Sequence, residues 1–158
     1  MSIRQYRPRN NRRRGISANQ SFGLILLFAL TVSFQITYPL VSGDTLRYVT
    51  IFFVISGALL MLVHSFLSYG FKYFALFGST TFIFSLLVEI LGSKTGWPFG
   101  TYEYDPSLGP QLLGIPLVVP FAWAMMAHPL LLVARRMTKT WTFLYGGFAL
   151  MAWDLFLD

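Results

Sequence analysis

The sequence predicts an all-α fold, a polytopic bundle of about five transmembrane helices. Two observations carry this prediction. Of the 158 residues 55% are hydrophobic and only 11% are charged, whereas soluble domains carry about 25% charged residues. Six of the twelve basic residues also lie within the first fourteen positions, directly before a long apolar stretch. A basic segment next to an apolar helix is a typical topology signal of integral membrane proteins.

Five apolar stretches approach the length of a membrane span, which takes about 20 residues for about 30 Å of hydrocarbon. They cover residues 22–41, 48–69, 74–91, 112–133 and 141–158. The turn Ser42-Gly43-Asp44 ends the first stretch, and Pro116 and Pro120 lie where the fourth begins. Residues 92–111 interrupt the pattern with glycines, prolines and charges, so we expect a long loop there.

The remaining charges predict the orientation. Cytoplasmic segments of membrane proteins carry an excess of Lys and Arg. With the amino terminus in the cytoplasm, that side holds the six tail arginines and four further basic residues, Lys72, Arg135, Arg136 and Lys139. The opposite side holds only Arg47 and Lys94. The alternation is consistent at every turn and places the amino terminus in the cytoplasm.

The organisation therefore has two parts. Residues 1–20 are expected to be a basic, disordered cytoplasmic tail, either solvated or resting on anionic lipid. Residues 21–158 form the transmembrane helical domain. After Arg14 the formal charges balance to zero, so no basic face is left for a nucleic-acid partner. The chain has no cysteine, which excludes thiol catalysis, thiolate metal sites and disulfides.

Three acids are the candidate catalytic residues: Glu89, Asp154 and Asp158. They lie in apolar surroundings near the non-cytoplasmic boundary, where a carboxylate costs roughly 2.5–3.5 kcal/mol on insertion scales. Such groups commonly mark functional sites. The other interpretation is that they are interfacial acids hydrated by headgroup water, and for Asp158 the two interpretations are equally weighted.

Two histidines lie toward the cytoplasmic side, His64 in the second stretch and His128 in the fourth. They could pair or bind a metal ion, but two histidines without nearby carboxylates make an incomplete metal site. We expect core or interfacial histidines, and no metal site is predicted.

The interrupting loop combines bend-forming glycines and prolines with aromatic residues, namely Trp97, Phe99, Tyr102 and Tyr104. An aromatic belt at the headgroups is one interpretation. The alternation with glycine and proline instead favours a structured, re-entrant loop packed over the mouth of the bundle, where protein satisfies its backbone.

Several motifs together resemble the family of carotenoid-biosynthesis membrane proteins, which includes bacterioruberin and gamma-carotene hydratases. The motifs are Glu89-Ile90-Leu91-Gly92, Gly96-Trp97-Pro98-Phe99-Gly100-Thr101-Tyr102-Glu103-Tyr104, Gly109-Pro110, Gly114-Ile115-Pro116, Pro120-Phe121-Ala122-Trp123-Ala124-Met125-Met126 and Ala152-Trp153-Asp154-Leu155-Phe156-Leu157-Asp158. The resemblance is close over residues 85–158 and extends to the earlier helices by hydropathy. Family members usually continue past the final Asp with further helices, so this chain is expected to be truncated or completed by a partner chain.

The resemblance implies addition of water to a terminal double bond of an acyclic carotenoid in a bacterial or archaeal plasma membrane. For this chemistry our hypothesis assigns acid and base roles to Glu89 and Asp154, with Asp158 in support. The end-group pocket would be lined by Trp97, Phe99, Tyr102, Tyr104 and Trp123. The carotenoid would arrive through the lipid bilayer, and this chemistry needs no redox or nucleotide cofactor.

Two alternatives stay open. Asp154 and Asp158 lie one turn apart and could hold magnesium and a diphosphate for prenyl transfer to a carotenoid, although a second acidic cluster is missing. The chain could also be a carotenoid-binding or accessory membrane subunit without its own catalysis. Its glycines and prolines would then shape helix contacts, with the acids hydrogen-bonded between helices.

Overall fold

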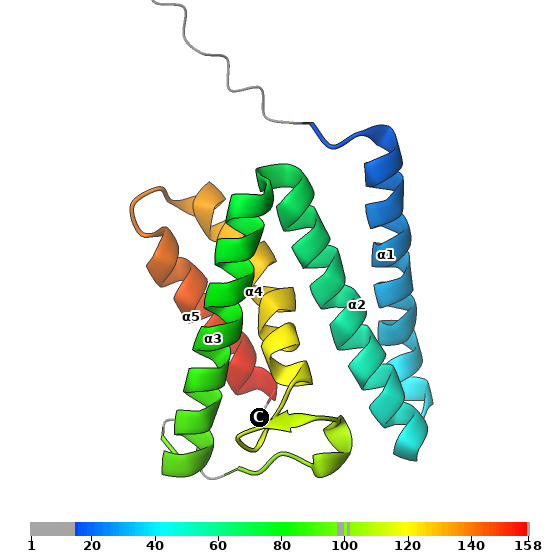
Figure 1. The fold of residues 1–158 in the computed structure, drawn as a ribbon, viewed down its shortest axis with the longest axis vertical. Helices are drawn as coiled ribbons and strands as arrows, with labels where there is room; N and C mark the ends of the chain where they lie inside the picture. The colour runs from blue at the N-terminus through cyan, green and yellow to red at the C-terminus, as the bar shows by residue number, and fades with distance from the viewer. Residues whose placement is uncertain (1–14, 98–99, 101, 158) are drawn as a thin grey trace, which may run out of the picture.

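The computed structural model describes residues 15–97, 100 and 102–157, without the side chains of 154–157. Its elements, in chain order, are α1 (Ala18–Thr37), η1 (Tyr38–Leu40), α2 (Gly43–Tyr69), α3 (Phe71–Thr95), η2 (Pro106–Leu108), β1 (Gln111–Leu112), β2 (Ile115–Pro116), α4 (Val118–Met137) and α5 (Thr142–Leu157). Successive helices run in opposite directions (Figure 1). The predicted all-α helix bundle is confirmed, with one short β-hairpin added.

Four helices, α1 to α4, are long and apolar enough to cross a membrane, and α5 is a shorter apolar helix. Large apolar side chains cover the outside of the bundle, as shown by Phe22, Phe52, Phe84 and Phe143, which are all more than half exposed. Lipid is the solvent in which such a surface is stable. The chain is therefore an integral membrane protein.

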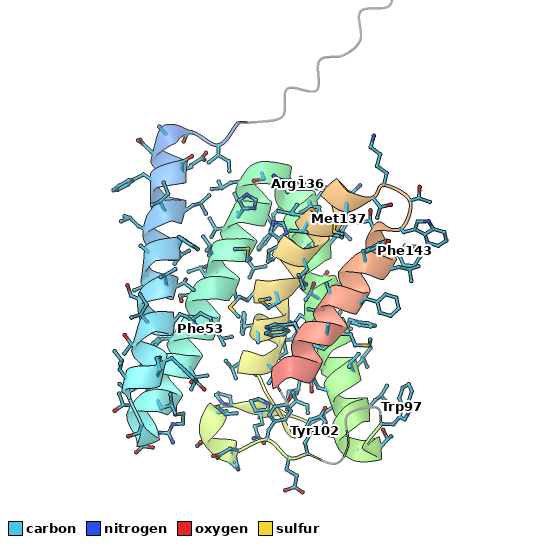
Figure 2. The ribbon with its side chains drawn as sticks, turned by 180° about the vertical axis from the view of Figure 1, so that it is seen from behind. Phe53, Trp97, Tyr102, Arg136, Met137 and Phe143 are labelled. Atoms are coloured by element: carbon cyan, nitrogen blue, oxygen red, sulfur yellow. The ribbon has the colours of Figure 1, made fainter. Side chains whose placement is uncertain are left out.

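Two ends of the bundle are distinguished below. The tail end is where α1 begins, and the loop end is where residues 96–117 connect α3 to α4 (Figure 1). Because the helices alternate in direction, the basic residues at the start of α3, such as Lys72, lie at the tail end. So do those at the end of α4, such as Arg136, which Figure 2 labels. This is the distribution that the sequence predicted. Which end faces the cytoplasm stays a prediction.

The bundle is held by α2 and α4, which pack against each other. Helix α1 packs on α2, while α3 and α5 pack on α4. Small residues allow this approach, since a side chain at Gly57 would meet Met125 of α4. A hydrogen bond of 3.1 Å from Thr31 to Ser56 joins α1 to α2. Close packing and interhelical hydrogen bonds are what stabilises helices against each other in lipid.

Several helix boundaries differ from the prediction, and α2 begins at Gly43 rather than residue 48. The first helix begins at Ala18 rather than residue 22, inside the stretch assigned to the tail; residues 1–14 lie outside the described part. The third continues through Gly92 to Thr95, and Gly96 ends it in a left-handed conformation with φ 68°. The fourth begins at Val118 rather than residue 112, because the chain first makes the β-hairpin.

The hairpin has a backbone reason. Leu113 and Gly114 have φ values of 54° and 89°, and two successive positive φ values reverse the chain between strands. An apolar run cannot reveal this turn, since Leu112, Leu113 and Ile115 read equally well as helix. The loop then lies across the end of the bundle, below α4 and α5 in Figure 1.

Candidate functional site

Glu89 is the one acidic residue buried inside the described bundle, with 5% of its surface exposed. It lies on α3, on a stripe of buried residues that repeats every three or four positions: Ser85, Leu86, Glu89 and Gly92. This spacing places them on one face of the helix. The face is directed toward α4 and the loop, so the carboxylate points into protein.

Three side chains donate hydrogen bonds to this carboxylate. The hydroxyls of Tyr102 and Tyr104 donate to Oε2 at 2.9 and 2.7 Å. The indole Nε1–H of Trp123, on α4, donates to Oε1 at 3.0 Å. We call Glu89, Tyr102, Tyr104 and Trp123 the carboxylate cluster. Four of the eight residues predicted for the site are thus brought together.

The local sequence explains how the loop reaches Glu89. Gly96 turns the chain back at the end of α3, and the tyrosines lie two positions apart with exposed Glu103 between them. Alternate residues of an extended chain point to the same side, and the two rings meet edge to face at 5.6 Å. Gly92 leaves the space for the Tyr102 hydroxyl, which would be 2.6 Å from a Cβ at that position.

The electrostatics of the cluster are unusual for a buried acid. Within the described residues the ion pair is Asp44–Arg47, on the surface of α2, so no basic side chain pairs with Glu89. A carboxylate has about four lone-pair sites, of which these donors use three. Hydrogen bonds to a charged group contribute about 1.5–3 kcal/mol each. Neutral dipoles therefore hold the carboxylate, and about one acceptor direction is left over.

The other predicted site residues do not join this cluster within the described structure. Trp97 is 78% exposed and points away from the bundle (Figure 2). Phe99 and Asp158 lie outside the described residues, and so does the side chain of Asp154. The prediction of a magnesium site at the two aspartates therefore also lies outside the described residues.

The backbone of Asp154 can be placed. It belongs to the last turns of α5, whose carboxy-terminal end reaches the same end of the bundle as the hairpin (Figures 1 and 2). The preceding residue, Trp153, lines a cavity of about 400 Å³ between α1, α2 and α4. Two acidic positions, Glu89 and Asp154, thus share the loop end.

A second, part-buried polar cluster lies toward the tail end. The rings of His64 and His128 are joined by a hydrogen bond of 3.0 Å between Nδ1 and Nε2. The outer nitrogen of His64 meets the Ser68 hydroxyl at 3.2 Å, and that of His128 meets the Tyr73 hydroxyl at 3.5 Å. We call these four residues the imidazole cluster. His128 is fully buried, so the expected core histidine is confirmed.

Sequence reasoning did not single out Ser68 or Tyr73. The signal for Ser68 was its position one turn after His64, which puts both on the same helix face. Nothing local connects Tyr73 to His128, because they lie on different helices. Within the described chain, no group of three or more His, Asp or Glu side chains is close enough to share a metal ion.

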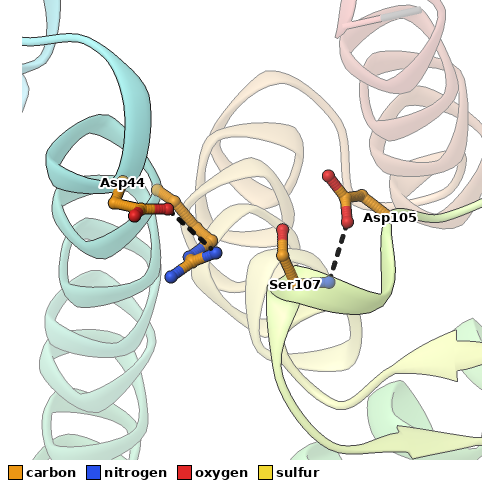
Figure 3. Close-up of polar contacts among 4 residues, drawn as sticks. Asp44, Asp105 and Ser107 are labelled. Atoms are coloured by element: carbon orange, nitrogen blue, oxygen red, sulfur yellow. Dashed lines mark hydrogen bonds and ion pairs between the residues drawn. The ribbon is translucent and has the colours of Figure 1, made fainter.

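The surface of the loop end carries its own acid. Asp105 caps the short helix η2, accepting a hydrogen bond of 2.8 Å from the Ser107 amide (Figure 3). That amide, with a smaller effect of Arg47 on α2, holds the pKa of the Asp105 carboxyl below its ordinary value. Asp105 is exposed and lies apart from Glu89. Its role is to shape the loop.

Comparison with known proteins decides the family. A sequence model described as carotenoid biosynthesis protein matches residues 49–158. The chain belongs to this family. The matched region contains both polar clusters and the loop, so the resemblance seen in the motifs is confirmed for this carotenoid biosynthesis protein.

Among curated relatives, the bisanhydrobacterioruberin hydratase of Haloarcula japonica is 42% identical over 52 residues. These residues are 33% of this chain and 17% of the hydratase, so the similarity spans a small part of that protein. No solved structure matches the chain. The family places this membrane protein in carotenoid biosynthesis.

Proposed function

We propose that this carotenoid biosynthesis protein adds water to a terminal carbon–carbon double bond of an acyclic carotenoid end group. The observation that carries the proposal is the buried Glu89 carboxylate, held by three aromatic donors and paired with no cation among the described residues. A fixed, buried carboxylate is suited to accept a proton from water. The hydratase relative supports this reaction class.

The reaction has two steps. An acid donates a proton to the less substituted alkene carbon, and the π electrons form the new C–H bond. The adjacent tertiary carbon is left as a cation. Water then forms the C–O bond with this cation and gives a proton to a base, so that the net change is addition of one water. The acid and base regain their states by proton exchange through the hydrated loop end.

We assign the base to Glu89. All three of its neighbours direct protons at the carboxylate oxygens, an arrangement that favours an acceptor. The developing cation would lie beside the same negative charge and beside the faces of Tyr102, Tyr104 and Trp123. Aromatic faces stabilise cations by about 0.5–2 kcal/mol each. For the acid we propose Asp154, because its helix ends at the same end of the bundle.

The substrate follows from the surroundings of the site. The bundle has an apolar outer surface and four helices long and apolar enough to cross a membrane, and carotenoids dissolve in lipid. We therefore propose that the substrate enters laterally from the bilayer while water enters from the loop end. The tail residues that would meet anionic lipid lie almost entirely outside the described part of the chain.

Pigment analysis tests the proposal. Cells that make an acyclic carotenoid would be analysed by chromatography and mass, with and without this chain. A gain of one water per modified end that requires Glu89 establishes a hydratase. Inserted protein that leaves the pigment unchanged contradicts it. Pigment that is bound but not converted would instead identify an accessory, carotenoid-binding subunit.

A further inference from the structure

An apolar groove of about 460 Å³ runs along the outside of the bundle between α2, α3 and α4. Its lining includes small residues, Ala75, Gly78, Ser79 and Ala124, which we call the floor. It also includes three aromatic residues, Phe74, Phe82 and Phe121, which we call the walls. Two of these, Phe82 and Phe121, meet edge to face at 6.2 Å across the junction of α3 and α4.

The groove leads toward Glu89. On α3 its residues Ala75, Gly78 and Phe82 follow a spacing of three and four, and the same stripe continues through Leu86 to Glu89. Residues at this spacing share one helix face. On α4 the groove is lined by Pro120 and Ala124, and Trp123 between them donates to Glu89. One end of the groove thus lies two turns from the carboxylate cluster.

The length and shape of the path suit a stiff rod. On α3 the lining runs from Phe74 to Ile83, about 13 Å of helix at 1.5 Å per residue, and Glu89 lies about 9 Å further along the same helix. A floor of small residues lets a flat chain approach the helix backbone closely. Aromatic walls pack favourably against a conjugated π system, because aromatic groups prefer offset and edge contacts.

We propose that this groove binds the polyene chain of the carotenoid whose end group is converted at Glu89. The inference rests on the proposed function for the position of the end group. It adds a substrate-binding surface on the tail-end half of α3, remote from the reacting atoms. It also specifies an extended, rigid substrate that lies along the helix axis.

Gly78 offers the sharpest test. A Cβ at this position would have one neighbour, Leu62, at an ordinary 3.7 Å, so a larger side chain extends into the groove without displacing backbone. Gly78→Leu should fill the floor, and Ala75→Leu should do the same one turn away. Gly23→Leu is the matched control, since Gly23 lies on α1 with nothing within 4 Å.

The experiment uses the 158-residue chain in lipid nanodiscs, titrated with an acyclic carotenoid. Visible circular dichroism detects the polyene, because a bound chain in a chiral groove acquires a signal that the free pigment lacks. We expect binding by wild type and Gly23→Leu, and at least tenfold weaker binding by Gly78→Leu and Ala75→Leu. Far-ultraviolet circular dichroism and monodispersity identify variants that fail to fold.

The outcomes separate this proposal from the hydratase proposal. Glu89→Gln should keep the visible signal while losing hydrated product, because it leaves the groove intact. Unchanged binding in both folded leucine variants would overturn the groove assignment and leave hydration untouched. The groove assignment would also be overturned if those variants lost a copurified phospholipid but kept polyene binding. That result would identify the groove as a lipid site.

Discussion

The carboxylate cluster and the imidazole cluster lie toward opposite ends of the same bundle, and each is hydrogen-bonded around one buried group, Glu89 or His128. They differ in composition. The first directs three donors at one acidic group, using α3, α4 and the loop. The second is a chain of neutral side chains running Ser68–His64–His128–Tyr73 between α2, α4 and α3.

This difference separates chemistry from packing. In a linear chain of polar groups, each side chain has its hydrogen-bonding groups satisfied by its neighbours. Such a chain joins three helices here, which is the ordinary use of polar residues between membrane helices. Converging donors instead fix one group in place at a substantial cost of burying charge. We therefore propose the imidazole cluster as a structural junction and the carboxylate cluster as the site of hydration.

Among the substitutions that test this comparison, Glu89→Gln should have the largest effect on hydration. The amide keeps the shape but cannot accept a proton, and its NH2 group would face a donor. Hydration per inserted molecule should fall about 100-fold or more, within the range for loss of a general base. Product yield by mass is the measurement. Glu103→Gln, the same change on an exposed loop acid, is the control, and equal losses in both variants would remove Glu89 from the mechanism.

Trp123→Phe should have the next largest effect. It keeps an aromatic ring beside the cation but removes the indole donor to Oε1. Loss of a hydrogen bond to a charged group should cost about 1.5–3 kcal/mol, or roughly tenfold to hundredfold in rate. Phe84→Leu is the control, because the Phe84 ring packs edge to face on the Trp123 ring, with centroids 6.2 Å apart, and carries no group that can donate to Glu89. A larger loss in the control would mean that packing, not donation, is the role of Trp123.

Gly92→Ala tests the position of the loop tyrosine. The new methyl group would displace the Tyr102 hydroxyl, and hydration should fall about tenfold, the lower end for one hydrogen bond to a charged group, because Tyr104 still donates to the same oxygen. Tyr102→Phe removes the hydroxyl oxygen that the new methyl group would meet, and the nearest ring carbon is 3.4 Å from a Cβ at position 92. The double variant should therefore be no worse than Gly92→Ala alone. Independent, multiplying losses would show that the glycine acts elsewhere.

Much of this site was predictable, for identifiable reasons. An acid in an apolar helix is conspicuous, and the motifs around the tyrosines and Trp123 are distinctive. The direction of the tyrosines was not predictable. They were expected to line a pocket, yet they bond Glu89, 13 and 15 positions earlier. That contact depends on the left-handed turn at Gly96 and on the path of the loop, which hydropathy does not encode.

His128→Phe should have little effect on chemistry and a measurable effect on stability. It preserves the ring contacts with Tyr73 and Phe77 but breaks the chain of hydrogen bonds. Thermal unfolding in detergent should show a loss of about 1 kcal/mol, as for other interhelical hydrogen bonds. Hydration per folded molecule should stay within about twofold, which corresponds to about 0.4 kcal/mol in the activation barrier. Lost hydration at unchanged stability would reverse the assignment of the two clusters.

Asp105→Asn should have the smallest effect and completes the series. Because the folded pKa of Asp105 is lowered, its cap of Ser107 is fully formed above the ordinary aspartate pKa of about 3.9 and is lost as the pH falls through the lower folded value. In the wild type, the hydrogen-exchange rate of the Ser107 amide should therefore rise as the cap is lost in acid. Asparagine can accept the same hydrogen bond but does not titrate, so this rise should be absent in Asp105→Asn. Asp44→Asn, on α2, should leave that rise in place. Hydration near neutral pH should be unchanged in both variants, because this carboxyl shapes the surface of the loop while Tyr102 and Tyr104 hold the site from within.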